Sequence, residues 1–215
     1  RDPFEPVVED GKLFGLGSND AGGCLVSLIA TFLYYYEKEN LSHNVVFAAS
    51  AEEEISGVNG IELVLPYLGN INFGIVGEPT KMDMAVAERG LMVIDCIAQG
   101  KAGHAARKEG INALYIAMDD INWIRNYKFD KVSPLLGESM LTVTVIGTEN
   151  QQHNVVPPQC KFVIDVRVNE LYTFDEILGE LKQNLKSQFK PRTTRMKSTS
   201  IPMDHPLVKA GIELG

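Results

Sequence analysis

The chain has 215 residues, 45% of them hydrophobic and 22% charged, which is the composition of a globular protein with one or two domains. Its net charge of -8 argues against nucleic acid as a partner. No apolar run approaches the roughly 18 residues that span a membrane. The three cysteines are far apart and form no CxxC pair, which favours a reducing cytoplasm.

Residues 1–19 are rich in proline, glycine and acid, and a helix is predicted after them. Apolar residues recur at helical spacing from Leu25 to Tyr36, and Asn40 could close the helix. Asp20 therefore falls at a helix N-terminus, where it could serve as an N-cap. The glycine-rich segment before this helix contains neither GxGxxG nor GKS/T, so its sequence is only a weak indication of phosphate binding.

The next apolar run, residues 44–49, is β-branched and aromatic, and it predicts a buried strand. Three consecutive carboxylates follow it: Glu52, Glu53 and Glu54. They could form a solvated acidic loop. Open α/β sheets, however, bind ligands outside the carboxyl ends of their strands, so one glutamate could bind a metal while its neighbour moves protons.

A short helix is predicted over residues 57–69, and a second buried strand over residues 71–77 that ends at Glu78. Alternating helices and strands predict right-handed parallel crossovers. Asp20, Glu54 and Glu78 could then converge at one edge of a mostly parallel sheet. Three oxygen ligands suit one or two divalent cations.

The pattern changes at about residue 88, where strands and helices follow the order β-α-β-β-α-β. This order predicts a ferredoxin-like module over residues 88–200, inserted into an α/β domain made of residues 1–87 and 201–215. The predicted strands are residues 91–98, 140–146, 161–168 and 194–200, and the predicted helices are residues 112–127 and 174–189.

Three positions in this insert are candidates for binding or catalysis. His104 and Arg107 lie in a glycine-rich turn, although a plain turn with a surface histidine is the simpler reading. Asn154 lies in a loop before a strand. Arg167, near a strand end, could form a bidentate pair with a substrate carboxylate or a salt bridge with a neighbouring acid, Asp165 or Glu170.

Together these residues resemble the di-zinc family of aminoacylases, acetylornithine deacetylases, succinyl-diaminopimelate desuccinylases and glutamate carboxypeptidases. The family pattern is an Asp after a glycine-rich turn, Glu-Glu, Gly-Glu-Pro-Thr, Gly-x-x-Gly-His, Asn-x-x-Pro and Asp-x-Arg. Each motif is weak alone, but six in order across nearly the whole chain are specific. The matching positions are Asp20 and residues 53–54, 77–80, 100–104, 154–157 and 165–167.

The resemblance implies a mostly parallel metallohydrolase domain with an inserted ferredoxin-like lid through which two copies form a homodimer. Asp20 would bridge two divalent metal ions, zinc or alternatively cobalt, with Glu54 on one ion and Glu78 on the other. Glu53 would be the general base that later returns the proton to the leaving amine. His104, from the partner's lid, would hold the developing oxyanion. The substrate-binding residues would be Asn154, Arg107 and Arg167.

The chain departs from the family pattern in the turn before Asp20, where Leu16 and Gly22 replace an arginine and a lysine. The resemblance also places one further histidine ligand before Arg1 and another after Gly215. We therefore expect an interior segment of a longer family member, with three of the five expected ligands.

The expected activity is metal-dependent hydrolysis of the amide bond of an N-acyl amino acid in arginine biosynthesis, with N-acetyl-L-ornithine, or a related N-acyl ornithine or citrulline, as the leading substrate. A succinyl-diaminopimelate desuccinylase, a metallo-dipeptidase or a carboxypeptidase on the same scaffold is the alternative. A dimerisation or binding module without catalysis is the alternative from a different functional class.

Overall fold

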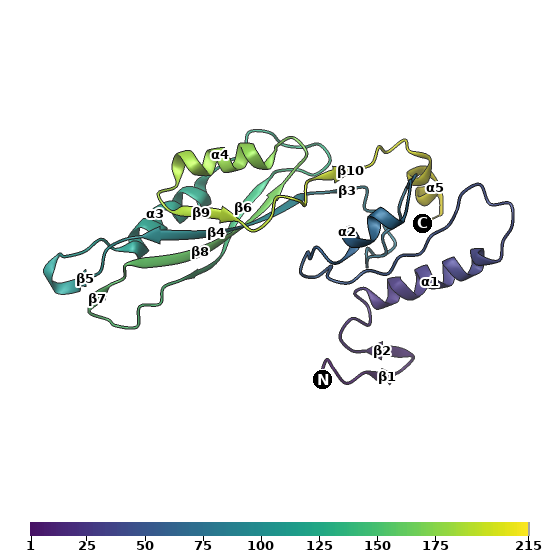
Figure 1. Ribbon diagram of the computed structural model, residues 1–215, viewed down its shortest axis with the longest axis horizontal. Coiled ribbons are helices and arrows are strands. Elements are labelled where there is room, and N and C mark those ends of the chain that lie inside the picture. Colours follow the sequence, from purple (N-terminus) through teal and green to yellow (C-terminus); the bar gives the residue numbers. More distant parts are fainter. Residues whose placement is uncertain (215) are drawn as a thin grey trace. The chain divides into compact units, whose positions relative to one another are not determined.

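The computed structural model describes residues 1–214, which form two compact units, residues 1–83 and residues 84–214 (Figure 1). The first unit contains a short hairpin followed by helices. The predicted helix after Asp20 is confirmed, and a short helix lies within residues 57–69 as predicted. The elements of this unit are β1 (Val7–Glu9), β2 (Lys12–Phe14), α1 (Gly22–Tyr36), α2 (Ile61–Val64) and the 3-10 helix η1 (Leu65–Tyr67).

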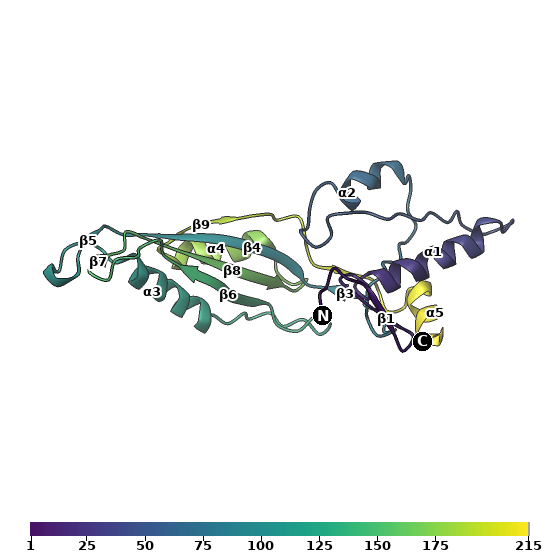
Figure 2. The ribbon, with the colours of Figure 1, turned by 90° about the horizontal axis from the view of Figure 1, so that it is seen from below.

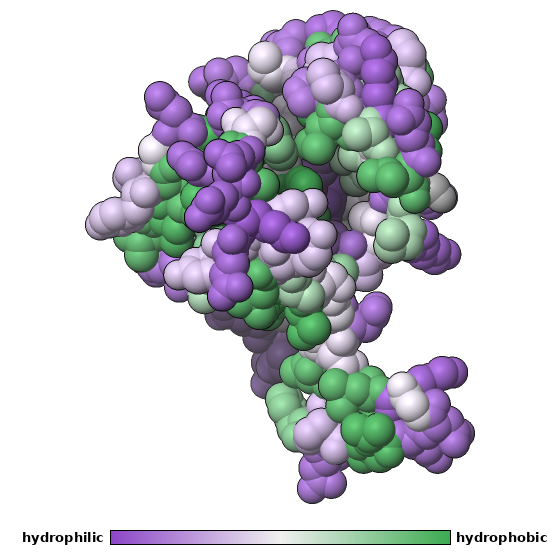
Figure 3. All heavy atoms as spheres, turned by 90° about the vertical axis from the view of Figure 1, so that its right-hand side faces the viewer, coloured by the Kyte–Doolittle hydropathy of each residue, from purple (hydrophilic) through white to green (hydrophobic). Residues whose placement is uncertain are grey.

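Two predicted strands, residues 44–49 and 71–77, do not form strands in this structure. Val46 and Val76 within them are 63% and 82% exposed. A buried parallel strand needs strands beside it and helices over both faces, and the described part of the first unit supplies only α1, α2 and η1 around them. The prediction was wrong for these segments because an apolar run does not reveal whether partner strands are present. Apolar side chains are accordingly exposed on the side seen in Figure 3.

The second unit has the predicted β-α-β-β-α-β order. Its four-stranded sheet has the spatial order β6-β8-β4-β9, and all neighbouring strands are antiparallel (Figures 1 and 2). The elements are β3 (Ala87–Glu88), β4 (Gly90–Gln99), β5 (Gly103–His104), the 3-10 helix η2 (Ala105–Arg107), α3 (Ala113–Asn126), β6 (Met140–Gly147), β7 (Val155–Val156), β8 (Gln159–Val168), α4 (Phe174–Asn184), β9 (Gln188–Pro191), β10 (Thr199–Ser200) and α5 (Pro206–Leu214).

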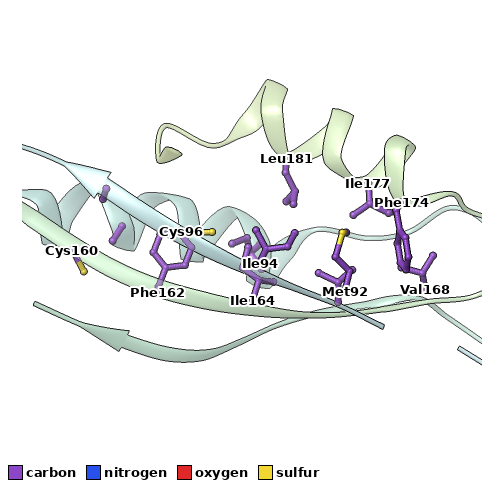
Figure 4. Packing of buried hydrophobic residues seen from close by; sticks show 14 of the residues in the cluster. Met92, Ile94, Cys96, Cys160, Phe162, Ile164, Val168, Phe174, Ile177 and Leu181 are labelled. Carbon is purple, nitrogen blue, oxygen red and sulfur yellow. The ribbon is translucent and has the colours of Figure 1, made fainter. Parts of the chain in front are cut away.

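The core lies between one face of this sheet and the helices α3 and α4 (Figure 4). Alternate residues of β4 and β8 are buried because successive side chains of a strand point to opposite faces. Full burial of one such aliphatic side chain stabilises the fold by about 1.5–3 kcal/mol. The core includes Ile94 of β4, Ile164 of β8 and Leu181 of α4, each 0% exposed.

The predicted C-terminal part of this module needs two corrections. Helix α4 ends at Asn184 rather than at residue 189, and the fourth sheet strand is β9 rather than residues 194–200. Asp120 of α3 explains both, because its carboxylate accepts the backbone N–H groups of Lys186 and Ser187. These hydrogen bonds draw the chain out of the helix and into β9. Strand β10 pairs with β3 instead.

Helix α5 belongs to the second unit, which begins at Met84. A Cβ added at Gly211 of α5 would lie 1.8 Å from the Met84 sulfur, so the two are in close contact. The domain assignment made from the sequence, with residues 1–87 and 201–215 in one domain and residues 88–200 as its insert, stays a prediction. Within residues 1–214, none of the helices has the length and apolar content required to cross a membrane.

Candidate metal centre and lid tip

Asp20 lies just before α1 but does not cap it. The N-cap position is Ala21, and no side chain accepts a hydrogen bond there. The Asp20–Ala21 peptide bond is cis. Asp20 instead lines a cavity of about 530 Å³ within the first unit, and Glu54 lines the same cavity. Two of the three predicted metal ligands, 34 positions apart in the sequence, therefore lie at one site.

The three consecutive glutamates have different environments. Glu52 has a positive φ of 63° and closes a local turn, accepting the backbone N–H of Asn59 at 2.9 Å and its side-chain amide at 3.1 Å. Gly57 is required beside it, since a Cβ there would lie 2.0 Å from Glu52 Oε2. Glu54 lines the cavity, and the backbone carbonyl of Glu53 accepts the N–H of Ser56. The turn made by Glu52 was not predicted from the sequence, although the glycines after the triplet signal one.

Glu78 lies beside the N-terminal half of α1. A Cβ on the preceding residue, Gly77, would be 2.8 Å from Leu28 and 3.2 Å from Cys24, so the chain passes directly against this helix. Glu78 is not among the residues lining the cavity of Asp20 and Glu54. Across residues 1–214, histidine, cysteine and acidic side chains do not gather in threes in a way that could hold a metal ion. The structure thus brings together two of the three predicted ligands.

The cavity is acidic beyond its two predicted ligands. Asp2 and Glu5 also line it, and Arg1, the basic residue among the described lining residues, pairs with Glu9. Leu16, which stands where the family has an arginine, lines the same cavity and leaves it without that positive charge. Carboxylate oxygens without a neutralising cation suit a divalent metal ion, so the chemistry of the residues fits the predicted group.

His104 and Asn154 lie side by side at the tip beyond one end of the four-stranded sheet, which we call the lid tip (residues 100–111 and 150–156; Figure 1). Strand β5 pairs with β7, which places His104 opposite Val155. The N–H of Ala105 donates to the carbonyl of Asn154 at 2.9 Å. Two motifs separated by about 50 positions are therefore joined by backbone hydrogen bonds.

The glycines of the lid tip allow it to fold tightly onto itself. A Cβ at Gly103 would lie 2.3 Å from the carbonyl oxygen of Glu109, and one at Gly100 would lie 2.1 Å from that of Ile111. Lys101 and Ile111 also exchange two backbone hydrogen bonds of 2.8 Å. The Gly-x-x-Gly spacing before the histidine thus has a steric cause, and it fixes the backbone that carries His104.

The hydrogen bonding of His104 defines which ring nitrogen is available. Its Nδ1 accepts the backbone N–H of Ala106 at 3.2 Å, so a neutral ring carries its proton on Nε2. His104 is exposed, and among residues 1–214 only its Nδ1 has a hydrogen-bond partner, so Nε2 can donate outward. An N–H donor fixed in this way is suited to stabilising an oxyanion.

Arg167 pairs with Asp165, one of the two partners expected from the sequence. The distances are 2.8 Å from Nε to Oδ1 and 3.1 Å from Nη2 to Oδ2, and these hydrogen bonds raise the pKa of the guanidinium. Glu170, the other expected partner, accepts the Ser133 hydroxyl. From Gln159, the first residue of β8, to Arg167 the strand rises about 27 Å, so Arg167 and the lid tip lie at opposite ends of the sheet.

The second unit is thus an antiparallel α/β module whose tip consists of two hydrogen-bonded loops. Residues 86–193, half of the chain, match the M20_dimer family, described as a peptidase dimerisation domain. The chain belongs to this M20 peptidase family. The predicted resemblance is confirmed at the level of the family.

Similar proteins with curated names support the same family. A succinyl-diaminopimelate desuccinylase from Wolbachia pipientis subsp. Culex pipiens (strain wPip) is 26% identical over 217 residues, which cover 94% of this chain and 54% of that protein. One from Rickettsia rickettsii (strain Sheila Smith) is 26% identical over 199 residues, covering 87% and 52%. The chain therefore spans about half the length of these relatives.

Solved structures agree on the fold. The M20 family metallo-carboxypeptidase Sso-CP2 from Sulfolobus solfataricus has a TM-score of 0.74 at 16% identity, covering 99% of this chain and 63% of its own. The aminopeptidase PepT from Bacillus cereus ATCC 10987 has a TM-score of 0.70 at 16% identity, covering 98% and 60%. Because both similarities extend over both units, the predicted fold class, an α/β fold with a lid domain, is confirmed.

Proposed function

We propose that this chain is part of a metal-dependent hydrolase that cleaves the amide bond of an N-acyl amino acid. The observation that carries the proposal is the acidic cavity shared by Asp20 and Glu54, with Glu53 adjacent in the sequence. The similar desuccinylases favour an N-succinyl amino acid, the alternative expected from the sequence, over N-acetyl-L-ornithine. Succinyl-diaminopimelate is therefore the first substrate to test.

The proposed mechanism divides the work among acidic side chains and the lid tip. Asp20, Glu54 and Glu78 would hold two divalent cations, zinc or cobalt. These cations would supply the Lewis acidity that polarises the amide carbonyl and acidifies a water molecule. Glu53 would take the proton of that water during attack and deliver it to the nitrogen of the leaving amine. The Nε2–H of His104 would donate to the oxyanion that develops on the carbonyl oxygen.

The two edges of the sheet support a homodimer formed through β6. Strand β9 is short and carries Lys190 and Pro191, which disfavour pairing with a further strand. Strand β6 is eight residues long and uncharged, and Val145 and Ile146 are 57% and 51% exposed on it. No strand within residues 1–214 pairs with its outer edge. A second copy of β6 would satisfy these unpaired backbone groups.

Dimerisation also supports the proposal that His104 acts on the partner's substrate. Arg167 and the lid tip of one chain are about 27 Å apart along β8, farther than one small substrate extends. Asn154 and His104 could therefore contact the same substrate as Arg167 only if the two ends of the sheet come from different subunits. We propose this arrangement, with Asn154 and Arg167 positioning the substrate.

The experiment is turnover of a substrate panel by the full-length protein loaded with zinc or cobalt, comparing N-succinyl amino acids, N-acetyl-L-ornithine and dipeptides. Glu53→Gln should lower kcat by about 10²–10⁴ while metal content, measured by elemental analysis, stays unchanged. Glu52→Gln is the matched control: it retains an oxygen for the Asn59 turn and should keep most of the turnover. No hydrolysis of any panel member by a stable dimer would instead favour the dimerisation or binding module.

A further inference from the structure

The lid tip carries a second polar group one helical turn after His104. His104 is the N-cap of the one-turn 3-10 helix η2, which ends at Arg107. A 3-10 helix rises about 2 Å per residue, so the Cα atoms of His104 and Arg107 lie about 6 Å apart along its axis. His104 itself has an extended backbone, and one helical turn separates it from Arg107.

The charge of Arg107 is not neutralised within the part of the chain that the structure describes. Neither a hydrogen bond nor an ion pair engages its exposed guanidinium there. The neighbouring residue, Lys108, also lacks such a partner among residues 1–214. Some cations of the same unit are paired, such as Lys161 with Glu149 and Arg167 with Asp165. The lid tip thus presents a cationic group beside its histidine.

The alternative is a solvated arginine that only stabilises the end of η2. A single 3-10 turn has a small dipole, and such surface contributions are worth about 0.3–1 kcal/mol. That role would accept any cation and would have no effect on substrate choice. The backbone of the tip is also fixed by the contacts at Gly100 and Gly103, so the separation of the His104 and Arg107 backbones is held by the fold.

We infer that Arg107 binds a carboxylate at the far end of the acyl group and so selects dicarboxylic acyl chains of succinyl length; this rests on the proposed function, in which His104 contacts the scissile carbonyl. Two CH₂ groups between the carboxyl carbons, with bonds of about 1.5 Å, separate them by about 4 Å. This length is compatible with the spacing of His104 and Arg107. A guanidinium binds a carboxylate through two parallel hydrogen bonds, which an acetyl group cannot accept.

The test uses the full-length, zinc-loaded protein and two substrates that share one amino acid, one N-succinylated and one N-acetylated. Arg107→Gln should lower kcat/KM for the N-succinyl substrate by about 10- to 100-fold, mainly through KM, and leave the N-acetyl substrate within about twofold. Arg107→Lys should restore part of the loss. Arg125→Gln, the same change at an exposed arginine of α3, is the control and should alter neither substrate.

A binding readout separates recognition from turnover. Succinate should inhibit the wild type more strongly than propionate, and this difference should disappear in Arg107→Gln. An equal loss for both substrates, or an undiminished preference for succinate, would overturn the role of Arg107 while leaving the proposed hydrolase intact. A wild-type protein that hydrolyses neither substrate would instead overturn the proposed function, and this inference with it.

Discussion

Replacing Asp120 by asparagine tests how the second unit is held together. Asp120 is 2% exposed, and its two carboxylate oxygens accept the N–H groups of Lys186 at 2.9 Å and Ser187 at 2.8 Å. In asparagine one oxygen becomes an NH₂ group, so one buried backbone donor loses its acceptor. We expect a loss of about 2–4 kcal/mol in the free energy of unfolding, because the remaining bond also loses its charge. The melting temperature should fall by about 5–15 °C.

The assay is urea unfolding followed by the fluorescence of Trp123, the single tryptophan of the chain, which lies on the same helix as Asp120. Asp119→Asn is the matched control. Its ion pair with Lys186 is exposed, with the Asp119 side chain 65% accessible, so its removal should cost about 0–1 kcal/mol. A loss for Asp120→Asn no larger than that of the control would refute the role assigned to the two backbone hydrogen bonds.

Two further predictions concern the start of α4 and the edge of the sheet. Hydrogen bonds from Thr173, first its backbone N–H, and an ion pair with Lys131 lower the pKa of Glu176 from 4.5 to about 2. A carboxyl group whose pKa is lower in the folded state stabilises the fold at pH values above its unfolded-state pKa. This stabilisation is lost as the pH falls through the folded-state pKa. Wild type and Glu176→Gln should therefore differ in unfolding free energy by a constant amount above about pH 5 and converge towards pH 2; an undiminished difference at pH 2 would contradict this. Val145→Lys on β6 should shift the protein from dimer to monomer in sedimentation velocity, whereas Val132→Lys in an exposed loop should not; a Val145→Lys protein that stays dimeric would exclude this edge.

The parts of the fold that could be predicted are those in which local pattern and tertiary packing agree. Strand β8 alternates buried and exposed residues along its length, and α1 follows its apolar spacing. The lid tip could be predicted in part, because the glycines before His104 signal a tight turn. The sequence did not reveal that Asn154 is hydrogen-bonded to the same tip, since that contact depends on the pairing of β5 with β7.

The parts that could not be predicted depend on partners far along the chain. Asp120 falls on the buried face of α3, where helical periodicity predicts an apolar residue, and its partners are 66 and 67 positions away. Residues 44–49 have the composition of a strand, but a strand forms only beside another strand. Glu52 illustrates a third limit, since three identical side chains in a row do not indicate which one closes a turn.

Subunit complementation tests whether His104 acts on the active site of the partner subunit. In the proposed mechanism a Glu53→Gln subunit would be inactive in its own site, and a His104→Ala subunit would leave its partner's site inactive, so each variant alone should show little turnover. Unfolding and refolding the two together should restore about a quarter of wild-type activity, because half of the dimers are mixed and each holds one intact site. Mixtures that stay as inactive as either variant would contradict a lid histidine that acts across the dimer.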